Sequence, residues 1–215
     1  RQNQLGRAYL FDFFSRCDEI WTSSEEAKAF LAEHGFSGNV EVFDNGTGQE
    51  AASEAARSRA REEFHLGATP ALLFAGSLDS RKNLPLMFEA AALLRQRDVR
   101  FQLLIAGSGP DEKHARTLVK ELGLTGTVRF LGPVSDESLL GGLYAESALY
   151  LCPVPGVNAG LAAREAAVQG TPSLTVAGSA SSGLIQNGVN GLTCADTAVS
   201  MADAIERFLG DPETI

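Results

Sequence analysis

From Ala68 onward, short runs of apolar residues alternate with longer stretches of helical spacing, and this alternation constrains the fold more than any other feature. The apolar runs are continuous, which is typical of parallel strands covered by helices on both faces. Strands joined through helices by right-handed crossovers build a doubly wound sheet. We therefore predict an α/β fold with a parallel sheet. The predicted strands are Ala71–Ala75, Phe101–Ala106, Thr127–Leu131, Ala148–Cys152, Thr171–Val176 and Leu192–Cys194.

The first 48 residues carry a smaller strand–helix–strand pattern. Its predicted strands are Asp18–Thr22 and Asn39–Phe43, with a helix between them. The stretch Gln49–Gly67 is rich in Ala, Glu and Arg, and this composition predicts a solvated helix. We place a domain boundary in or near it. The predicted organisation is therefore a first unit over 1–48, a linker helix over 49–67 and a main domain over 68–215.

Composition and charge narrow the functional classes. Hydrophobic residues make up 44% of the 215-residue chain, enough for a full core, and the net charge is −9. A negative charge argues against nucleic acid and anionic lipid as partners. No apolar run approaches the ~20 residues of a transmembrane helix. The three cysteines lack metal-ligand spacing and predict reduced thiols in a cytoplasmic protein, with a peripheral position at the inner membrane face as the alternative.

The stretch Pro153–Pro172 is the strongest functional lead. It follows a predicted strand, contains a glycine-bearing loop, and continues into a predicted helix over Gly160–Gln169. This order offers a helix N-terminus to an anion. Glu165 stands about a turn and a half into the helix, where its carboxylate can face the same crevice. The alternative is an exposed helix acid with no such role.

A second polar loop, Gly76–Asn83, follows the first strand of the main domain. Lys82 in this loop can point over the carboxyl ends of the strands, or it can be a solvated residue at the start of a helix. Because Lys82 and Glu165 both follow buried strands of one parallel sheet, both can face one crevice. Gly107-Ser-Gly109 is an incomplete dinucleotide fingerprint, since Glu112 stands at the third glycine position, and a tight turn is the favoured interpretation.

Several catalytic motifs are absent from the sequence. It contains no G-x-x-x-x-G-K-[ST] phosphate loop and no Asp-x-Asp pair that would hold a metal-bound diphosphate. No Ser/His/Asp or Cys/His arrangement stands out. We therefore expect neither a metal nor a cofactor.

Taken together, the order of motifs resembles the carboxy-terminal, donor-binding domain of retaining GT-B-fold glycosyltransferases of family 4, the glycosyl transferases group 1. The resemblance covers roughly residues 70–210 and implies a Rossmann-like sheet. The first 48 residues resemble the tail of that fold's amino-terminal domain. The stretches that carry the resemblance are Leu73–Leu84, Leu104–Pro110, Val128–Val134, Gly160–Ala166 with Gly170–Pro172, and Asn187–Gly191.

The resemblance implies the transfer of a hexose-type sugar from a nucleotide-diphosphate sugar to an acceptor glycan or lipid, without a metal. The implied catalytic residues are Lys82, which would meet the diphosphate, and Glu165, whose two oxygens would accept hydrogen bonds from the ribose hydroxyls. The backbone around Leu131 and Val134 would contact the base. The implied donor-binding residues are Gly76, Ser77, Lys82, Gly107, Leu131, Val134, Ala159, Gly160, Leu161 and Glu165.

Two positions depart from the family pattern. Ser77 stands where the family usually has Arg, and Val157 stands where it has a second Glu, eight residues before Glu165. Losing a charge-assisted hydrogen bond costs about 1.5–3 kcal/mol. We expect most of the amino-terminal domain, with the acceptor site, to lie outside this chain, which is then inactive alone. The alternatives are a degenerate, non-catalytic nucleotide-sugar-binding module and another GT-B-like enzyme such as an epimerase.

Overall fold

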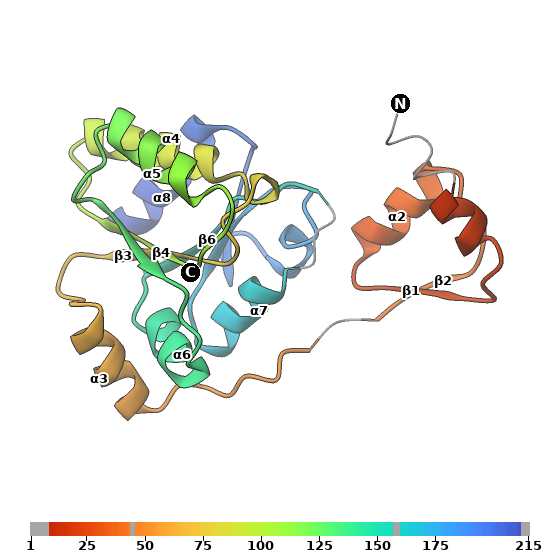
Figure 1. Cartoon of the computed structure of the whole chain (residues 1–215), viewed down its shortest axis with the longest axis horizontal. Coiled ribbons are helices and arrows are strands. Elements are labelled where there is room, and N and C mark those ends of the chain that lie inside the picture. The colour runs from red at the N-terminus through yellow and green to blue at the C-terminus, as the bar shows by residue number, and fades with distance from the viewer. Residues whose placement is uncertain (1–8, 44–45, 157–159, 212–215) are drawn as a thin grey trace.

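The computed structural model describes residues 9–43, 46–156 and 160–211, and these form two parallel sheets (Figure 1). The larger sheet has six strands in the order β5-β4-β3-β6-β7-β8, with every neighbouring pair parallel. This is the strand order of a Rossmann fold, and it confirms the predicted doubly wound α/β sheet. Its strands are β3 (Ala71–Ala75), β4 (Gln102–Ala106), β5 (Val128–Gly132), β6 (Leu149–Cys152), β7 (Ser173–Val176) and β8 (Gly191–Cys194).

Helices cover both faces of this sheet, because alternate side chains of each strand enter different cores. On one face, Leu72 and Phe74 pack with α4, α5 and α8, and on the other Leu73 packs with α3, α6 and α7. The helices are α3 (Glu54–Glu63), α4 (Leu84–Gln96), α5 (Glu112–Glu121), α6 (Glu137–Ala145), α7 (Leu161–Val168) and α8 (Ala198–Gly210), with two 3-10 turns, η1 (Ser80–Lys82) and η2 (Ser182–Leu184).

The amino-terminal part forms its own small sheet. In it, β1 (Ile20–Thr22) and β2 (Val40–Val42) pair in parallel, and α2 (Glu25–Glu33) connects them. A further helical segment covers residues 9–14. The predicted strand–helix–strand pattern of this region is confirmed. Across the described ranges, no helix combines the length and apolar character needed to cross a membrane.

The linker helix differs from its prediction in two ways. It begins at Glu54 rather than Gln49, and residues 50–52 are instead held by the side chain of Gln169, which accepts from Ala52 N at 2.7 Å and donates to Glu50 O at 2.9 Å. It is also not solvated all round, since Ala56 and Ala60 are buried. The composition predicted a solvated helix because the residues of its buried face are alanines, which are also common on helix surfaces.

The helix α3 packs closely against α6. Two ion pairs connect them, from Arg57 Nε and Arg61 Nη1 to Glu146 Oε1, at 2.7 and 2.9 Å. At the contact, a Cβ placed on Gly142 would lie 2.3 Å from the carbonyl oxygen of Ala56. Glycine at 142 therefore allows the two backbones to approach each other.

We expect Gly142→Ala and Gly141→Ala to change stability in opposite directions. Alanine is favoured over glycine inside a helix by about 0.5–1 kcal/mol. A Cβ on Gly141 would meet ordinary contacts, the nearest at 3.4 Å, so this variant should gain stability. The Gly142→Ala variant must push α3 away and should lose about 1–3 kcal/mol. Urea unfolding of the two variants measures the difference, and a stabilised Gly142→Ala variant would contradict the close packing of α3 on α6.

Candidate functional site

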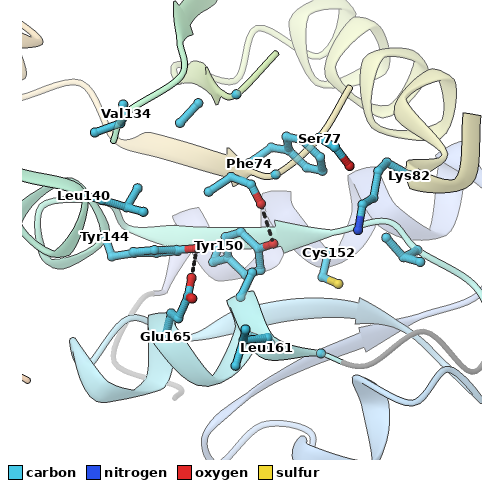
Figure 2. A pocket seen from close by; sticks show the side chains of 18 of the residues that line it. Phe74, Ser77, Lys82, Val134, Leu140, Tyr144, Tyr150, Cys152, Leu161 and Glu165 are labelled. Carbon is cyan, nitrogen blue, oxygen red and sulfur yellow. Dashed lines mark hydrogen bonds between the residues drawn. The ribbon is translucent and has the colours of Figure 1, made fainter. Parts of the chain in front are cut away.

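A cavity of about 490 Å³ lies at the carboxyl edge of the six-stranded sheet. It is lined from the loops after β3, β4, β5 and β6 and from the start of α7 (Figure 2). The strands β3 and β6 are neighbours, and the chain reverses its direction of winding between them. Crevices at such switch points are where doubly wound sheets bind ligands, and the volume is in the range of small-molecule pockets.

Eight of the ten predicted donor-binding residues line this one cavity. Leu131 is not among the lining residues; its partly buried side chain packs against the core on the face covered by α3, α6 and α7, while Pro133 and Val134 reach the cavity. The backbone contact predicted at Leu131 stays a prediction. Ala159 and Val157 lie outside the described residues. The eight are Gly76, Ser77, Lys82, Gly107, Val134, Gly160, Leu161 and Glu165.

The glycines after β3 and β4 allow two loops to touch. Leu78 N donates to Ser108 O at 2.9 Å, and Gly76 N donates to Ala106 O at the same distance. A Cβ on Gly107 would lie 1.8 Å from Gly76 O, and Gly107 has a φ of +147°. The glycines in Gly107-Ser-Gly109 are thus explained by tight local packing, and the loops in turn form one wall of the cavity.

Lys82 and its neighbour Arg81 face different environments. Arg81 Nε and Nη2 donate to the Asp79 carboxylate at 2.9 and 3.0 Å, and the Arg81 side chain is 76% exposed. Lys82 lines the cavity, and within the described part of the chain no salt bridge includes it. Of the two interpretations of Lys82 that the sequence left open, the structure favours the cavity.

Asp79 also accepts a hydrogen bond from Ser77, which stands where the family that the sequence resembles usually has Arg. The Ser77 hydroxyl donates to Asp79 Oδ2 at 2.7 Å. Hydrogen bonds from Arg81 and then from Ser77 hold the pKa of the Asp79 carboxyl well below its usual range. Asp79 therefore stays ionised, and both Ser77 and Arg81 are directed toward it.

The start of α7 forms the wall opposite the β3 loop. Gly160 is the N-cap residue, and a Cβ there would lie 2.6 Å from Ser181 Oγ, so a small residue lets the helix begin close to the loop after β7. The first amides of a helix have no partner within the helix. Four residues after Leu161, Glu165 places its carboxylate in the cavity, where Oε2 accepts a hydrogen bond from Tyr144 Oη at 3.1 Å.

Sequence reasoning missed the aromatic floor of the cavity. Tyr144 comes from α6 and Tyr150 from β6, and their rings meet edge to face with centroids 5.5 Å apart. Tyr150 Oη donates to Ala75 O at 3.3 Å. Burial raises the pKa of both phenols, and burial likewise raises the pKa of the Cys152 thiol beside them. A buried tyrosine hydroxyl usually has a hydrogen-bond partner. Tyrosines within the apolar stretches around Tyr144 and Tyr150 are therefore the one sequence signal for these residues.

The two charged residues of the cavity lie at opposite ends of this neutral floor. Figure 2 shows Lys82 at one end and Glu165 at the other, with Tyr150 between them. Such a site suits an elongated ligand with anionic oxygens near the ammonium group and hydroxyl donors near the carboxylate. In the described ranges, no group of three or more His, Cys, Asp or Glu side chains could hold a metal ion.

Known proteins match the chain along most of its length. The family model described as "Glycosyl transferases group 1" matches residues 57–214. The D-inositol 3-phosphate glycosyltransferase of Pseudarthrobacter chlorophenolicus is 30% identical over 100% of this chain and 52% of its own length. The alpha-D-kanosaminyltransferase of Streptomyces kanamyceticus is 30% identical over 77% of this chain and 43% of its own length. The chain spans about half the length of the curated relatives it matches.

Solved structures share the fold. HepE of Anabaena, in complex with UDP-glucose, matches with a TM-score of 0.85 over 98% of this chain and 59% of its own. The two sequences are 20% identical, so this likeness concerns the fold alone.

Proposed function

The chain belongs to the glycosyl transferases group 1 family, and from this premise we propose that it is the donor-binding part of a retaining glycosyltransferase. The enzyme would transfer a hexose-type sugar from a nucleotide-diphosphate sugar to an acceptor glycan or lipid. The 215-residue chain would be inactive alone, and sugar transfer by this chain would contradict that part of the proposal. We place the protein in the cytoplasm, where its three free thiols would stay reduced, with a peripheral position at the inner membrane face as the alternative.

The observation that carries the proposal is the separation of charges in the cavity at the switch point. Lys82 lines the cavity from the loop after β3, and Glu165 lines it from α7, the helix that follows β6. A neutral, largely aromatic floor lies between them. A nucleotide-diphosphate sugar has the complementary order of groups, since its diphosphate is anionic and its ribose carries two hydroxyl donors. HepE, which has the same fold, was solved with UDP-glucose, and this supports the assignment.

At the phosphate end, Lys82 is the residue we assign to the diphosphate. Its ammonium group can offset the negative charge that develops on the leaving diphosphate, and the first amides of α7 at Gly160 and Leu161 can add hydrogen bonds. Gly76 has no side chain at the cavity wall, so its backbone can approach the phosphates closely, and Gly107, which packs against Gly76, lines the same wall. This set of donors can stabilise the leaving group without a metal.

At the other end, Glu165 is the residue we assign to the ribose. Its carboxylate can accept from the two vicinal hydroxyls. Pro133 and Val134, in the loop after β5, line the adjoining wall, where the base would lie against apolar side chains and backbone. The contact predicted at Leu131 would be made through its backbone.

The acceptor would approach from the side of the amino-terminal sheet. A second cavity, of about 320 Å³, is lined by Ser24 and Glu26 of that part, by Gly160 at the N-cap of α7, and by Leu161 and Arg164 of that helix. Gly160 and Leu161 line both cavities, so an acceptor in the second would lie next to a donor sugar in the first. A GT-B amino-terminal domain would complete the acceptor site.

A degenerate, non-catalytic nucleotide-sugar-binding module is the second candidate. Ser77 favours it, because this residue lines the cavity at the position where the family has Arg, but its short, neutral side chain donates to Asp79. Val157, which replaces the family's sugar-facing Glu, favours it as well. Calorimetry with UDP, GDP and their hexose conjugates separates the candidates. Binding of a conjugate more tightly than the free nucleotide shows an intact sugar site and supports the transferase. Equal affinities for conjugate and free nucleotide support the degenerate module, in which only the nucleotide half of the site would be kept.

Glu165→Gln should weaken the binding of UDP or GDP by about 5- to 30-fold and change the melting temperature by only a few degrees. Charge-assisted hydrogen bonds are roughly twice as strong as neutral ones, so two bonds to ribose would lose about 1–2 kcal/mol. Glutamine keeps an oxygen that can accept from Tyr144, which limits the effect on folding. If stability falls and affinity does not, Glu165 is only a structural helix acid.

A further inference from the structure

The hydrogen bond between Tyr144 and Glu165 joins two elements at the floor of the cavity. Tyr144 stands near the end of α6, and its side chain is fully buried. Its hydroxyl donates to Glu165 Oε2 on α7 at 3.1 Å (Figure 2). Both residues line the cavity, so the bond is made inside the site and not in a distant part of the core.

The hydroxyl of Tyr144 is a permanent donor. Burial, and then the charge of Glu165, raise the pKa of this phenol, which therefore keeps its proton at any physiological pH. A carboxylate has only acceptors, so the direction of the bond is fixed. Hydrogen bonds to an ionised oxygen are roughly twice as strong as neutral ones.

Tyr144 itself is held by its surroundings. Its ring packs edge to face on Tyr150, and its carbonyl oxygen accepts from Thr171 Oγ1, beyond the end of α7, at 2.7 Å. Thr171 is buried, so α6 is attached to the α7 region at two points. A free glutamate side chain has considerable rotamer freedom, and a fixed donor removes much of it.

We propose that Tyr144 is a positioning residue: by holding Oε2 of Glu165, it directs the carboxylate at the vicinal hydroxyls of the nucleotide ribose and so makes the site select ribose over deoxyribose. The inference rests on the proposed function, because it requires Glu165 to bind ribose. Tyr144 does not touch the nucleotide through its hydroxyl. Without it, Glu165 would remain in the cavity but would have to be ordered when the ligand binds, and this ordering costs affinity.

The test compares two ligands with and without the ribose hydroxyls. UDP and 2′,3′-dideoxy-UDP, and the matching GDP pair, are titrated into the wild-type chain and into Tyr144→Phe. Wild-type should prefer the ribonucleotide. Tyr144→Phe should reduce this preference by about fivefold, as expected for one lost hydrogen bond of the carboxylate. If the role of Tyr144 is purely structural, Tyr144→Phe should lower the affinity for both ligands by the same factor and leave the ratio of the two affinities unchanged.

Tyr150→Phe is the matched control. It removes a buried tyrosine hydroxyl from the same floor, but one that donates to Ala75 O and not to Glu165. Its ratio of ribose to dideoxyribose binding should equal that of wild-type. An equal loss of preference in Tyr150→Phe and Tyr144→Phe would overturn the proposal, since a general softening of the floor would then explain both.

Glu165→Gln and the double variant Tyr144→Phe/Glu165→Gln separate the binding of ribose by Glu165 from the positioning of Glu165 by Tyr144. If Glu165→Gln lowers the preference and Tyr144→Phe does not, the positioning role is wrong and the role of Glu165 stands. If wild-type shows no preference for ribose, the assignment of Glu165 fails and the inference fails with it. Tyr144→Phe added to Glu165→Gln should lower the preference no further, because the two residues act as a unit. Because the preference is a ratio of two affinities measured on the same protein, it does not depend on the fraction of Tyr144→Phe that is folded.

Discussion

Lys82→Met is expected to weaken the binding of UDP and GDP by about 10- to 100-fold. A hydrogen bond to a charged group contributes about 1.5–3 kcal/mol, and the Lys82 ammonium group lines the cavity without a salt bridge in the described ranges. Methionine keeps the unbranched stem, so packing is largely preserved and the melting temperature should hardly change. Calorimetry measures the loss. Uridine and guanosine, which lack the diphosphate, should bind both proteins equally.

Arg81→Met is the control for charge alone. Arg81 is the adjacent residue and has the same charge, but its guanidinium contacts Asp79 and lies outside the cavity lining. Its loss should change the affinity less than threefold, since exposed charges act weakly through solvent. An equal loss of nucleotide affinity in both variants would mean that Lys82 acts only through the overall positive charge of the loop and makes no direct contact with the diphosphate.

The sheet could be predicted from the sequence because its strands are buried on both faces. Runs such as Ala71–Ala75 and Ala148–Cys152 are apolar without interruption, and the strands β3 and β6 lie within them. The convergence of Lys82 and Glu165 on one cavity followed from the same pattern, since parallel strands place the loops after them at one edge. The domain boundary near residues 49–67 stays a prediction.

The residues that sequence reasoning missed have side chains whose partners are distant in the chain. Tyr144 stands in an apolar helix, where a tyrosine is an ordinary core residue, and only the fold brings its hydroxyl to Glu165. The buried face of α3 was missed for a related reason. Ala56 and Ala60 carry little hydrophobic signal, and their burial depends on the close approach that Gly142 allows.

Gly107→Ala is expected to lower the free energy of unfolding by about 2–5 kcal/mol. Its φ of +147° is a conformation that side chains rarely adopt, and the new Cβ would lie 1.8 Å from Gly76 O. The backbone strain costs about 1–2 kcal/mol and the overpacking about 1–3 kcal/mol. For a chain of this size, the melting temperature should fall by roughly 4–20 °C. Because the loops after β3 and β4 must separate, nucleotide affinity should fall as well, even at temperatures where the variant is folded.

Gly126→Ala distinguishes backbone strain from the clash between the loops. Gly126 also has a positive φ, of +92°, but a Cβ there would meet no atom within 4 Å. This variant should therefore lose only the strain of about 1–2 kcal/mol and keep its nucleotide affinity, since Gly126 does not line the cavity. Equal losses of stability in the two variants would show that the loops can separate at little cost. The wall of the site would then be adaptable, and Gly107 would be required for its backbone conformation alone.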